Sequence, residues 1–296
     1  MNRTQPAEQL AWAWARQRIW SQSANQLKQR LDRARRTALL LAITTAVLAV
    51  AANQIGGVSM PVGRTLSVMA AITAGVATLL QRRASTQRIR AWTRARSAAE
   101  GLKTEIYSYL AGGTTYAGAD RDQRLGIETH NIVEAVSDLE RHTLNVQPDS
   151  RPIPAVRDTD TYIALRIDDQ IHNYYRKKAA IYETRVVRLR TVGDLLGVIA
   201  IVLAAGAAAF QVDSLAAWVP VVTTIGTSLT AHIAAARYDH MVIEFLRTAQ
   251  RLEYLRDQYV NTPTNGASFI DACEDAISIE NQGWMARWVD ATSRDT

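Results

Sequence analysis

The chain has 296 residues, with 34 lysines and arginines against 28 aspartates and glutamates, a net charge of +6. The isoelectric point near 9.6 indicates an anionic partner, either a nucleic acid or an anionic lipid surface. Cys273 is the only cysteine, which excludes an intrachain disulfide and a cysteine-rich zinc site.

The chain begins with a segment rich in arginine and tryptophan, and its first apolar run starts only at Thr37. This order is not that of a secretory signal. Four apolar segments follow: Thr37–Ile55, Thr65–Gln81, Thr191–Gln211 and Ser214–Ala236. Each has a length that spans a bilayer, which takes about 17–25 residues. The formally charged residue within them, Asp194, lies in a first turn, from which a side chain reaches the interface.

A soluble bundle with alanine-rich core helices is the alternative to a membrane protein. Soluble helices keep a polar face, whereas Thr37–Ala52 has no polar residues except threonines. The sequence therefore predicts an all-α membrane protein with four transmembrane helices in two duplicated hairpins, carried on long cytoplasmic helices.

Short connections join the spans in pairs, Gln54–Arg64 in the first pair and Val212–Asp213 in the second. Each pair is therefore expected to be an antiparallel hairpin, and an even number of spans places both termini and the middle segment on one side. Basic residues concentrate on that side: Lys28, Arg30, Arg33, Arg35, Arg36, Arg82, Arg83, Arg88, Arg90, Arg94, Arg96, Arg176, Lys177, Lys178, Arg185, Arg188, Arg190 and Arg237. The positive-inside rule predicts that this side is cytoplasmic.

The position of the basic residues also decides which anionic partner we expect. They border the spans, where each favours anionic headgroups by about 1 kcal/mol, and no nucleic-acid motif competes with this interpretation. We therefore expect a multi-pass protein of the inner (plasma) membrane, with anionic lipid as a partner and no nucleic acid.

The two halves resemble each other in order: long helix, span, short loop, span, long helix. A shift of about 154 residues places the first span on the third and Trp20 on Tyr174, and after the loop a shift of about 150 places Leu102 on Leu252. We expect a first repeat at 1–145, a linker at 146–160 and a second repeat at 161–296. Further segments support this division: a helix at Asp120–His142, the linker with three prolines at Asn145–Asp160, and a C-terminal helix at Ser268–Asp290.

Motifs for catalysis are missing from the sequence, which has no nucleophile elbow, phosphate-binding loop or zinc-protease motif. We expect no enzyme activity, no catalytic residue, no metal site and no cofactor. His232 and His240 lie two helical turns apart, too far to share an ion easily. With Asp239 they are candidates for a gating or vestibule site, and locally bonded interfacial histidines are the alternative.

Hydroxyl residues form a stripe along the fourth span. Thr223, Thr227 and Thr230 follow a spacing of four and three residues, which places them on one helix face, and Thr224 and Ser228 lie beside them. Such a stripe faces either a water-filled path or a partner helix, where hydroxyl contacts contribute about 0.6–2 kcal/mol. Both interpretations stay open, and these five residues are the pore-lining candidates.

Small residues at a spacing of four indicate where helices approach closely. Gly193 and Gly197 form one such pair, and Ala70 and Ala74 form another. Both pairs are predicted to be helix-packing surfaces.

Two segments carry a recognisable pattern: Arg166-Ile-Asp-Asp-Gln170, followed by Tyr174, Tyr175 and Lys178, and Glu100-Gly-Leu-Lys-Thr-Glu105 with Tyr107, Tyr109 and Leu110. The first resembles the helix before the hairpin in the SLATT superfamily, and the second resembles the helix after it. The ending resembles its C-terminal helix in Phe269, Cys273, Glu274, Glu280, Gln282, Trp284 and Trp288. The resemblance covers nearly the whole chain as a tandem pair.

The SLATT family is bacterial, has two membrane helices per domain, and is associated with nucleotide-signalling and conflict systems as a proposed pore-forming effector. The chain carries no recognisable nucleotide sensor or synthase, so the resemblance implies an effector and leaves its trigger open. We expect a homo-oligomeric pore or ion channel, passing ions and gated by its cytoplasmic helices. The alternative is a non-conducting, membrane-anchored helical scaffold that binds a cytoplasmic partner. A membrane enzyme is disfavoured because no titratable cluster is evident.

The topology gives the first testable prediction. We expect a cysteine at position 60, between the first two spans, to react with an impermeant thiol reagent from outside the cell, and cysteines at 1, 148 and 296 to react only from inside. The experiment uses a Cys273→Ala background so that the introduced thiol is the only one. Labelling of position 60 only from the inside would show that the protein has the opposite orientation in the membrane.

Overall fold

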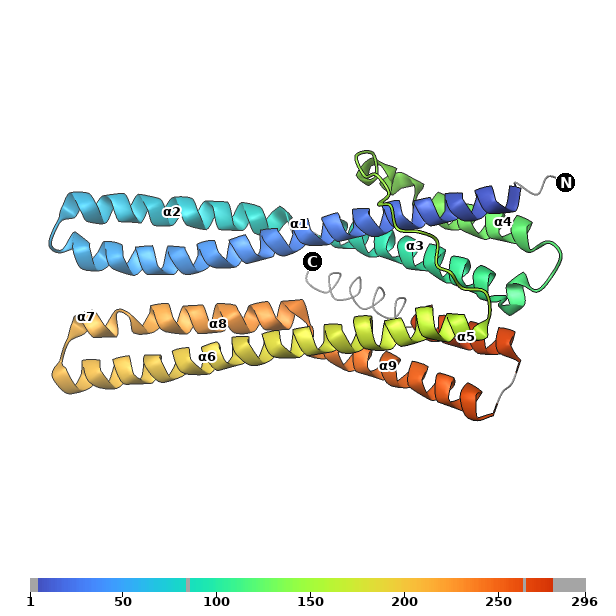
Figure 1. Cartoon of the computed structure of the whole chain (residues 1–296). Helices are drawn as coiled ribbons and strands as arrows, with labels where there is room; N and C mark the ends of the chain where they lie inside the picture. The colour runs from blue at the N-terminus through green and yellow to red at the C-terminus, as the bar shows by residue number, and fades with distance from the viewer. Residues whose placement is uncertain (1–4, 84–85, 263–264, 279–296) are drawn as a thin grey trace. The chain divides into compact units, whose positions relative to one another are not determined.

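The computed structural model describes residues 5–83, 86–262 and 265–278, and this part of the chain contains helices and no strand (Figure 1). Four helical stretches within it are long and apolar enough to cross a membrane. The predicted all-α class and the four predicted spans are therefore confirmed.

The first half begins with one continuous helix, α1 (Gln5–Gly56), that runs through the basic segment and the first span. The second span, α2 (Met60–Arg83), starts after only residues 57–59, so the predicted loop of Gln54–Arg64 was too long. A Cβ on Gly63 would lie 2.5 Å from the Cα of Gly56, so α1 and α2 approach each other there because neither residue has a side chain. Pro61 is tolerated in the first turn of α2, where its missing N–H has no helical acceptor.

After α2 the chain forms α3 (Thr86–Ala111), the short 3₁₀ helix η1 (Thr114–Tyr116) and α4 (Arg121–Glu134). The single helix predicted at Asp120–His142 is in fact broken. Its last part is a separate 3₁₀ helix, η2 (Ser137–His142).

The second half starts with a short helix, α5 (Thr159–Tyr162), and a π-helix, η3 (Ile163–Arg176). It continues with the following helices: α6 (Lys177–Phe210), α7 (Asp213–Ala216), α8 (Val219–Ala236), α9 (Tyr238–Asn261) and a helical stretch at 266–278.

Two helices predicted in the second half, the fourth span and the C-terminal helix, have other bounds in the described structure. The fourth span was predicted as one helix at Ser214–Ala236, but it is interrupted between α7 and α8, because Pro220 in the first turn of α8 cannot donate to a preceding turn. The C-terminal helix predicted at Ser268–Asp290 is helical up to residue 278, and its remainder, with Glu280, Gln282, Trp284 and Trp288, lies outside the described residues.

Two pairs of helix ends repeat at the predicted shifts. Helix α1 ends at Gly56 and α6 at Phe210, which differ by the shift predicted before the hairpin loop. Helix α3 ends at Ala111 and α9 at Asn261, which differ by the smaller shift predicted after it. The residues paired by that smaller shift, Leu102 and Leu252, are both fully buried. The halves therefore share helix order and register.

The chain divides into two compact units, and each takes segments from both halves. We call them the membrane unit (Leu31–Ser85 and Ala180–Val242) and the head unit (Met1–Arg30, Thr86–Ala179 and Ile243–Thr296). This spatial division cuts across the predicted sequence domains 1–145 and 161–296.

The packing of the head unit follows from spacings of three and four residues along its helices. The buried positions of α1 include Ala13, Gln17, Trp20, Ala24 and Leu27, and those of α3 include Trp92, Ala95, Ala99, Leu102 and Ile106. This alternation is the coiled-coil pattern, in which one seam of each helix faces its partner. The Gln17 amide donates to the carbonyl of Ala99 at 3.4 Å, which joins the two helices directly.

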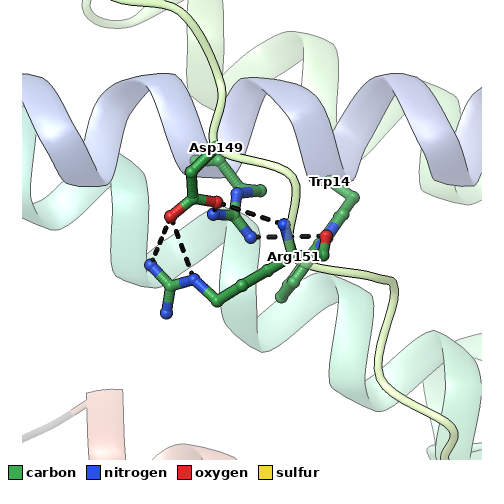
Figure 2. Close-up of polar contacts among 4 residues, drawn as sticks. Trp14, Asp149 and Arg151 are labelled. Carbon is green, nitrogen blue, oxygen red and sulfur yellow. Dashed lines mark hydrogen bonds and ion pairs between the residues drawn. The ribbon is translucent and has the colours of Figure 1, made fainter.

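Residues 146–157, within the segment with three prolines, form no helix, and this segment contacts α1 (Figure 2). The indole Nε1 of Trp14 donates to the carbonyl of Arg151 at 3.0 Å. Asp149 pairs with the buried Arg18 and also accepts from Arg151 Nη2 at 2.9 Å. The linker therefore contributes a counter-ion for a buried arginine of α1.

The glycine contact at the end of the first hairpin yields the second prediction. Gly63→Ala would place a methyl group against the backbone of α1, and we expect a loss of about 1–3 kcal/mol in stability, as for other overpacked sites. Gly75→Ala is the matched control, because it lies on the same helix and its new methyl group would meet nothing within 4 Å. Thermal unfolding in mild detergent compares the two, and equal midpoints would disprove the close contact.

Candidate functional site

Helix α8 differs from the other spans in the side chains that it exposes. Among its described residues, every large apolar side chain is buried or half-buried, and the exposed positions include Thr223, Thr224, Thr227 and Thr230. By contrast, α6 exposes Leu195, Val198, Ile199, Ile201 and Val202, and α2 exposes Val68, Met69, Ile72 and Leu79. The predicted hydroxyl stripe therefore lies on the outer surface of a single chain, with Ser228 half-buried beside it.

The threonine hydroxyls of this stripe donate to carbonyls of their own helix. Thr223 bonds to Val219, Thr227 to Thr223 and Thr230 to Gly226, at 3.0–3.1 Å. This back-bonding satisfies the hydroxyl proton without a partner helix. The oxygen lone pairs remain available as acceptors on the exposed face.

Threonines of the first hairpin have a different environment. The hydroxyl oxygens of Thr45 on α1 and Thr73 on α2 lie 2.8 Å apart and form a hydrogen bond between the two helices. Each of these hydroxyls is also within bonding distance of a carbonyl of its own helix. Interhelical hydroxyl packing thus occurs in the first hairpin, at residues that the stripe does not include.

The predicted small-residue pairs lie in two environments. Ala70 is buried and Ala74 half-buried on α2. A Cβ built on Gly193 or Gly197 would meet nothing within 4 Å, so no other part of the described chain packs closely there.

The vestibule candidates lie around the junction of α8 and α9. Asp239 is exposed and accepts from Arg190 Nη2 at 2.9 Å, and the half-buried His232 has its ring 6.5 Å from that of Tyr238. His240 is also half-buried. Arg237 adopts a left-handed conformation (φ 50°), which ends α8 and starts α9. The described residues contain no group of three or more histidines, cysteines or carboxylates that could hold a metal ion.

A buried charge cluster lies in the head unit, centred on Glu274 in the helical stretch 266–278. Both carboxylate oxygens accept from Arg166 of η3, at 2.9 and 2.8 Å, in a bidentate pair. Tyr162 of α5 donates to the carboxylate at 2.9 Å and Thr104 of α3 at 2.8 Å. Arg166 and Glu274 are only 1% and 3% exposed.

More charged and aromatic groups surround this pair. The guanidinium carbon of Arg166 lies 4.6 Å from the ring centroid of Tyr107, a cation–π contact. Arg96 forms an ion pair with Glu100 at 2.8 Å and donates to the Tyr174 hydroxyl at 2.7 Å. The cluster thus links α3 of the first half with η3 and the C-terminal stretch of the second half.

Family models match both halves of the chain. A model described as SMODS and SLOG-associating 2TM effector domain 1 matches residues 162–284. A second model, described as a protein of unknown function (DUF4231), matches residues 18–124. The second half of the chain contains a SLATT-type domain. Searches of curated proteins and of solved structures returned no match.

The match places the domain on the described architecture. It starts at Tyr162, at the end of α5, and includes η3, the second hairpin and α9, and it extends beyond the last described residue. The SLATT-type domain is a membrane-associated effector domain with two spans, and here these spans are α6 and α8.

The SLATT-type domain also contains residues that sequence analysis did not select as a site. The sequence named Arg166 and Glu274 only as part of the family resemblance and gave them no role in a site. The available signal was a charge within an apolar stripe: Glu274 lies between Ile270 and Ile277, at spacings of four and three residues that place all three on the buried face.

The electrostatics of the cluster yield the third prediction. Burial, and then the positive charge of Arg166, lower the pKa of Lys103 to about 8. Between that value and the ordinary pKa of about 10.4, the unfolded chain binds more protons than the folded one. Stability should therefore rise as pH increases through this range.

We expect Lys103→Met to raise the midpoint of thermal unfolding at pH 7 by roughly 6–13 °C. This range follows from a pKa lowered from about 10.4 to about 8, which corresponds to about 3 kcal/mol, and from about 2–4 °C per kcal/mol for a large domain. The difference from wild type should shrink as the pH rises toward about 11, where Lys103 is mostly neutral in both states. Lys177→Met, at an exposed position, is the control. A difference that does not depend on pH would exclude titration of Lys103 as its cause.

Proposed function

We propose that the protein is a homo-oligomeric membrane pore or ion-channel-like effector that is gated through its cytoplasmic helices. The observation that carries this proposal is the exposed face of α8, which presents Thr223, Thr227 and Thr230 and no large apolar side chain among its described residues. A conducting path needs polar lining, because apolar constrictions dewet. Since the stripe faces outward on one chain, several copies of α8 would have to surround the path.

The family match supports the same proposal at a coarser level, because its description names a two-span effector domain. The shared helix order and shifts support an origin by duplication. We further propose His232, Asp239 and His240 as the vestibule or gate next to the stripe, with the ion pair of Asp239 and Arg190 among its contacts.

We propose that the termini and the linker are cytoplasmic and that the membrane is the inner (plasma) membrane. The basic residues at the span ends support this orientation and an attraction to anionic headgroups. We propose no enzymatic activity, cofactor or nucleic-acid partner, since no sequence motif supports one.

A non-conducting scaffold that binds a cytoplasmic partner is the alternative. The extent of the head unit, which takes three segments of the chain, favours it. Ion flux through liposomes that contain the purified protein separates the two functions, because a scaffold gives none.

The fourth prediction tests the stripe. Thr227→Val keeps the shape of the side chain and removes the hydroxyl, so we expect altered conductance or ion selectivity with unchanged expression and oligomer mass. Thr44→Val is the matched control, because Thr44 is also an exposed, back-bonded threonine but lies in the first hairpin. Single-channel recording measures conductance, and mass measurement in nanodiscs measures assembly.

Two results would count against the proposal. If Thr227→Val weakens the oligomer and leaves the conductance of each channel unchanged, the hydroxyls serve packing between copies. If Val at positions 223, 227 and 230 changes neither property, the stripe does not line the path.

A further inference from the structure

The C-terminal stretch 266–278 is attached to the head unit through one buried charge, through apolar contacts around it, and through the half-buried Asp271, whose carboxylate accepts from the backbone N–H of Thr114 at 3.2 Å. Phe269, Ile270, Cys273 and Ile277 are at most 5% exposed, and Glu274 lies among them. The carboxylate of Glu274 has donors from α3, α5 and η3, which together occupy its acceptor sites. Glu274 is therefore the buried polar anchor of this stretch.

The π-helix η3 carries the arginine that binds Glu274, and its sequence fits the wider winding. Tyr162, Ile167, Ile171 and Tyr175 are all at most 1% exposed, at spacings of five, four and four residues. At the α-helical winding of about 3.6 residues per turn, Ile171 and Tyr162 would lie on opposite sides of the helix and could not both be buried on one face. π-helical turns are rare and occur frequently at functional sites. Here the π-helix leads directly into α6 at Lys177.

Contacts fix η3 at both ends. Near its start, Arg166 is held by Glu274, and at its end, the ring of Tyr175 lies 6.0 Å from that of Phe245 on α9. A helix held at both ends keeps its number of turns, so the wide winding persists only while both contacts hold. Two partly exposed ion pairs also join η3 to α9, Asp168 with Arg256 at 2.7 Å and Arg176 with Glu253 at 2.6 Å. The pair of Arg166 and Glu274 differs from them because it is buried and joins η3 to the stretch 266–278.

We propose that the stretch 266–278 is a latch: while Glu274 holds Arg166, residues 163–176 stay π-helical, and release of Glu274 lets them rewind into an α-helix and displace the start of α6. The guanidinium is not fully satisfied even when the latch is closed, because Arg166 Nη1 is buried and has no hydrogen-bond acceptor among the described residues. That deficit raises the energy of the closed latch and so reduces the energy needed for release.

The single cysteine of the chain reports the state of the latch. Cys273 is fully buried beside Glu274, and burial followed by the charge of Glu274 raises the pKa of its thiol, so it should react slowly with maleimide in wild-type protein. Glu274→Gln leaves Arg166 buried without a counter-ion. We expect the alkylation rate of Cys273 to rise more than about 100-fold, the size of effect typical of a broken buried ion pair.

Three variants separate release of the latch from unfolding. Asp275→Asn neutralises the exposed neighbouring acid and should leave Cys273 protected. Thr104→Val removes one of the four donors and should raise the rate by about 10-fold. The double variant Arg166→Met with Glu274→Leu replaces the pair by apolar side chains and should restore most of the protection.

Hydrogen exchange on the same samples shows whether the stretch 266–278 is released alone or unfolds together with the rest of the head unit. In Glu274→Gln, amides of α1 around Trp20 should stay protected while those of 266–278 exchange faster. If Cys273 stays unreactive in Glu274→Gln, or if the α1 amides lose protection together with it, the stretch is not a separable latch and the proposal is wrong.

Spin labels measure the rewinding itself. Ala164 and Lys177 are exposed near the two ends of η3, and labels on cysteines introduced there in a Cys273→Ala background report its length. An α-helix is longer per residue than the wider π-helix, with a rise of about 1.5 Å, so the distance between the labels should increase in Glu274→Gln. An unchanged distance would overturn the coupling between latch and helix winding.

Control of ion flux by the latch rests on the proposed function, and the two can fail separately. If Glu274→Gln conducts more than wild type and Asp275→Asn does not, the latch acts on the gate. If thiol and spin-label data show release but no variant conducts, the latch stands and the pore is rejected. Equal flux in all variants would reject the latch as a gate and retain the pore.

Discussion

A buried carboxylate sets the arrangement of the head unit. A carboxylate is costly to bury unless its oxygens are hydrogen-bonded and its charge is paired. Glu274 meets both conditions only because α3, α5 and η3 each bring a donor to it. These elements come from both halves of the chain, so the two repeats cannot reach this state independently. One acidic residue near the end of the described chain thus links segments about 100 to 170 positions earlier.

The same constraint explains the unusual helix that precedes α6. Apolar residues of η3 recur at spacings that suit a π-helix, and Arg166 must lie on the same buried side as they do. The wider winding brings Arg166 and Tyr175, nine residues apart, to the same side, whereas α-helical winding would place them on opposite sides. Helix α6 begins at Lys177, directly after the last residue of η3.

The membrane unit shows one residue type in two environments. Threonines of the first hairpin meet across α1 and α2, where Thr45 and Thr73 share a hydrogen bond. Threonines of α8 bond to their own backbone and stay exposed. In a membrane, the first arrangement contributes to helix packing, and the second leaves a polar face whose function depends on what surrounds the chain.

The sequence alone determined the elements of this protein. The four spans follow from their length and apolar composition, because the bilayer imposes a minimum number of residues. The sequence also indicates part of the repeat, since both shifts read from it recur in two pairs of helix ends. The predicted boundaries were wrong where a single residue decides them, such as Gly63 and Pro220, because close packing and proline geometry act locally.

Only the tertiary structure decided which charges meet and which hydroxyls face outward. The three residues that meet in the head unit are far apart in sequence: Thr104, Arg166 and Glu274. Spacing along a helix predicts which of its faces is buried, but not which residue of another helix that face contacts. The stripe on α8 was predicted from periodicity, but periodicity gives a face and not its neighbour. That face is exposed because the large apolar residues of α8, such as Val221 and Leu229, turn to the buried side. Helical periodicity is a property of one segment, whereas partnership between side chains requires the positions of at least two.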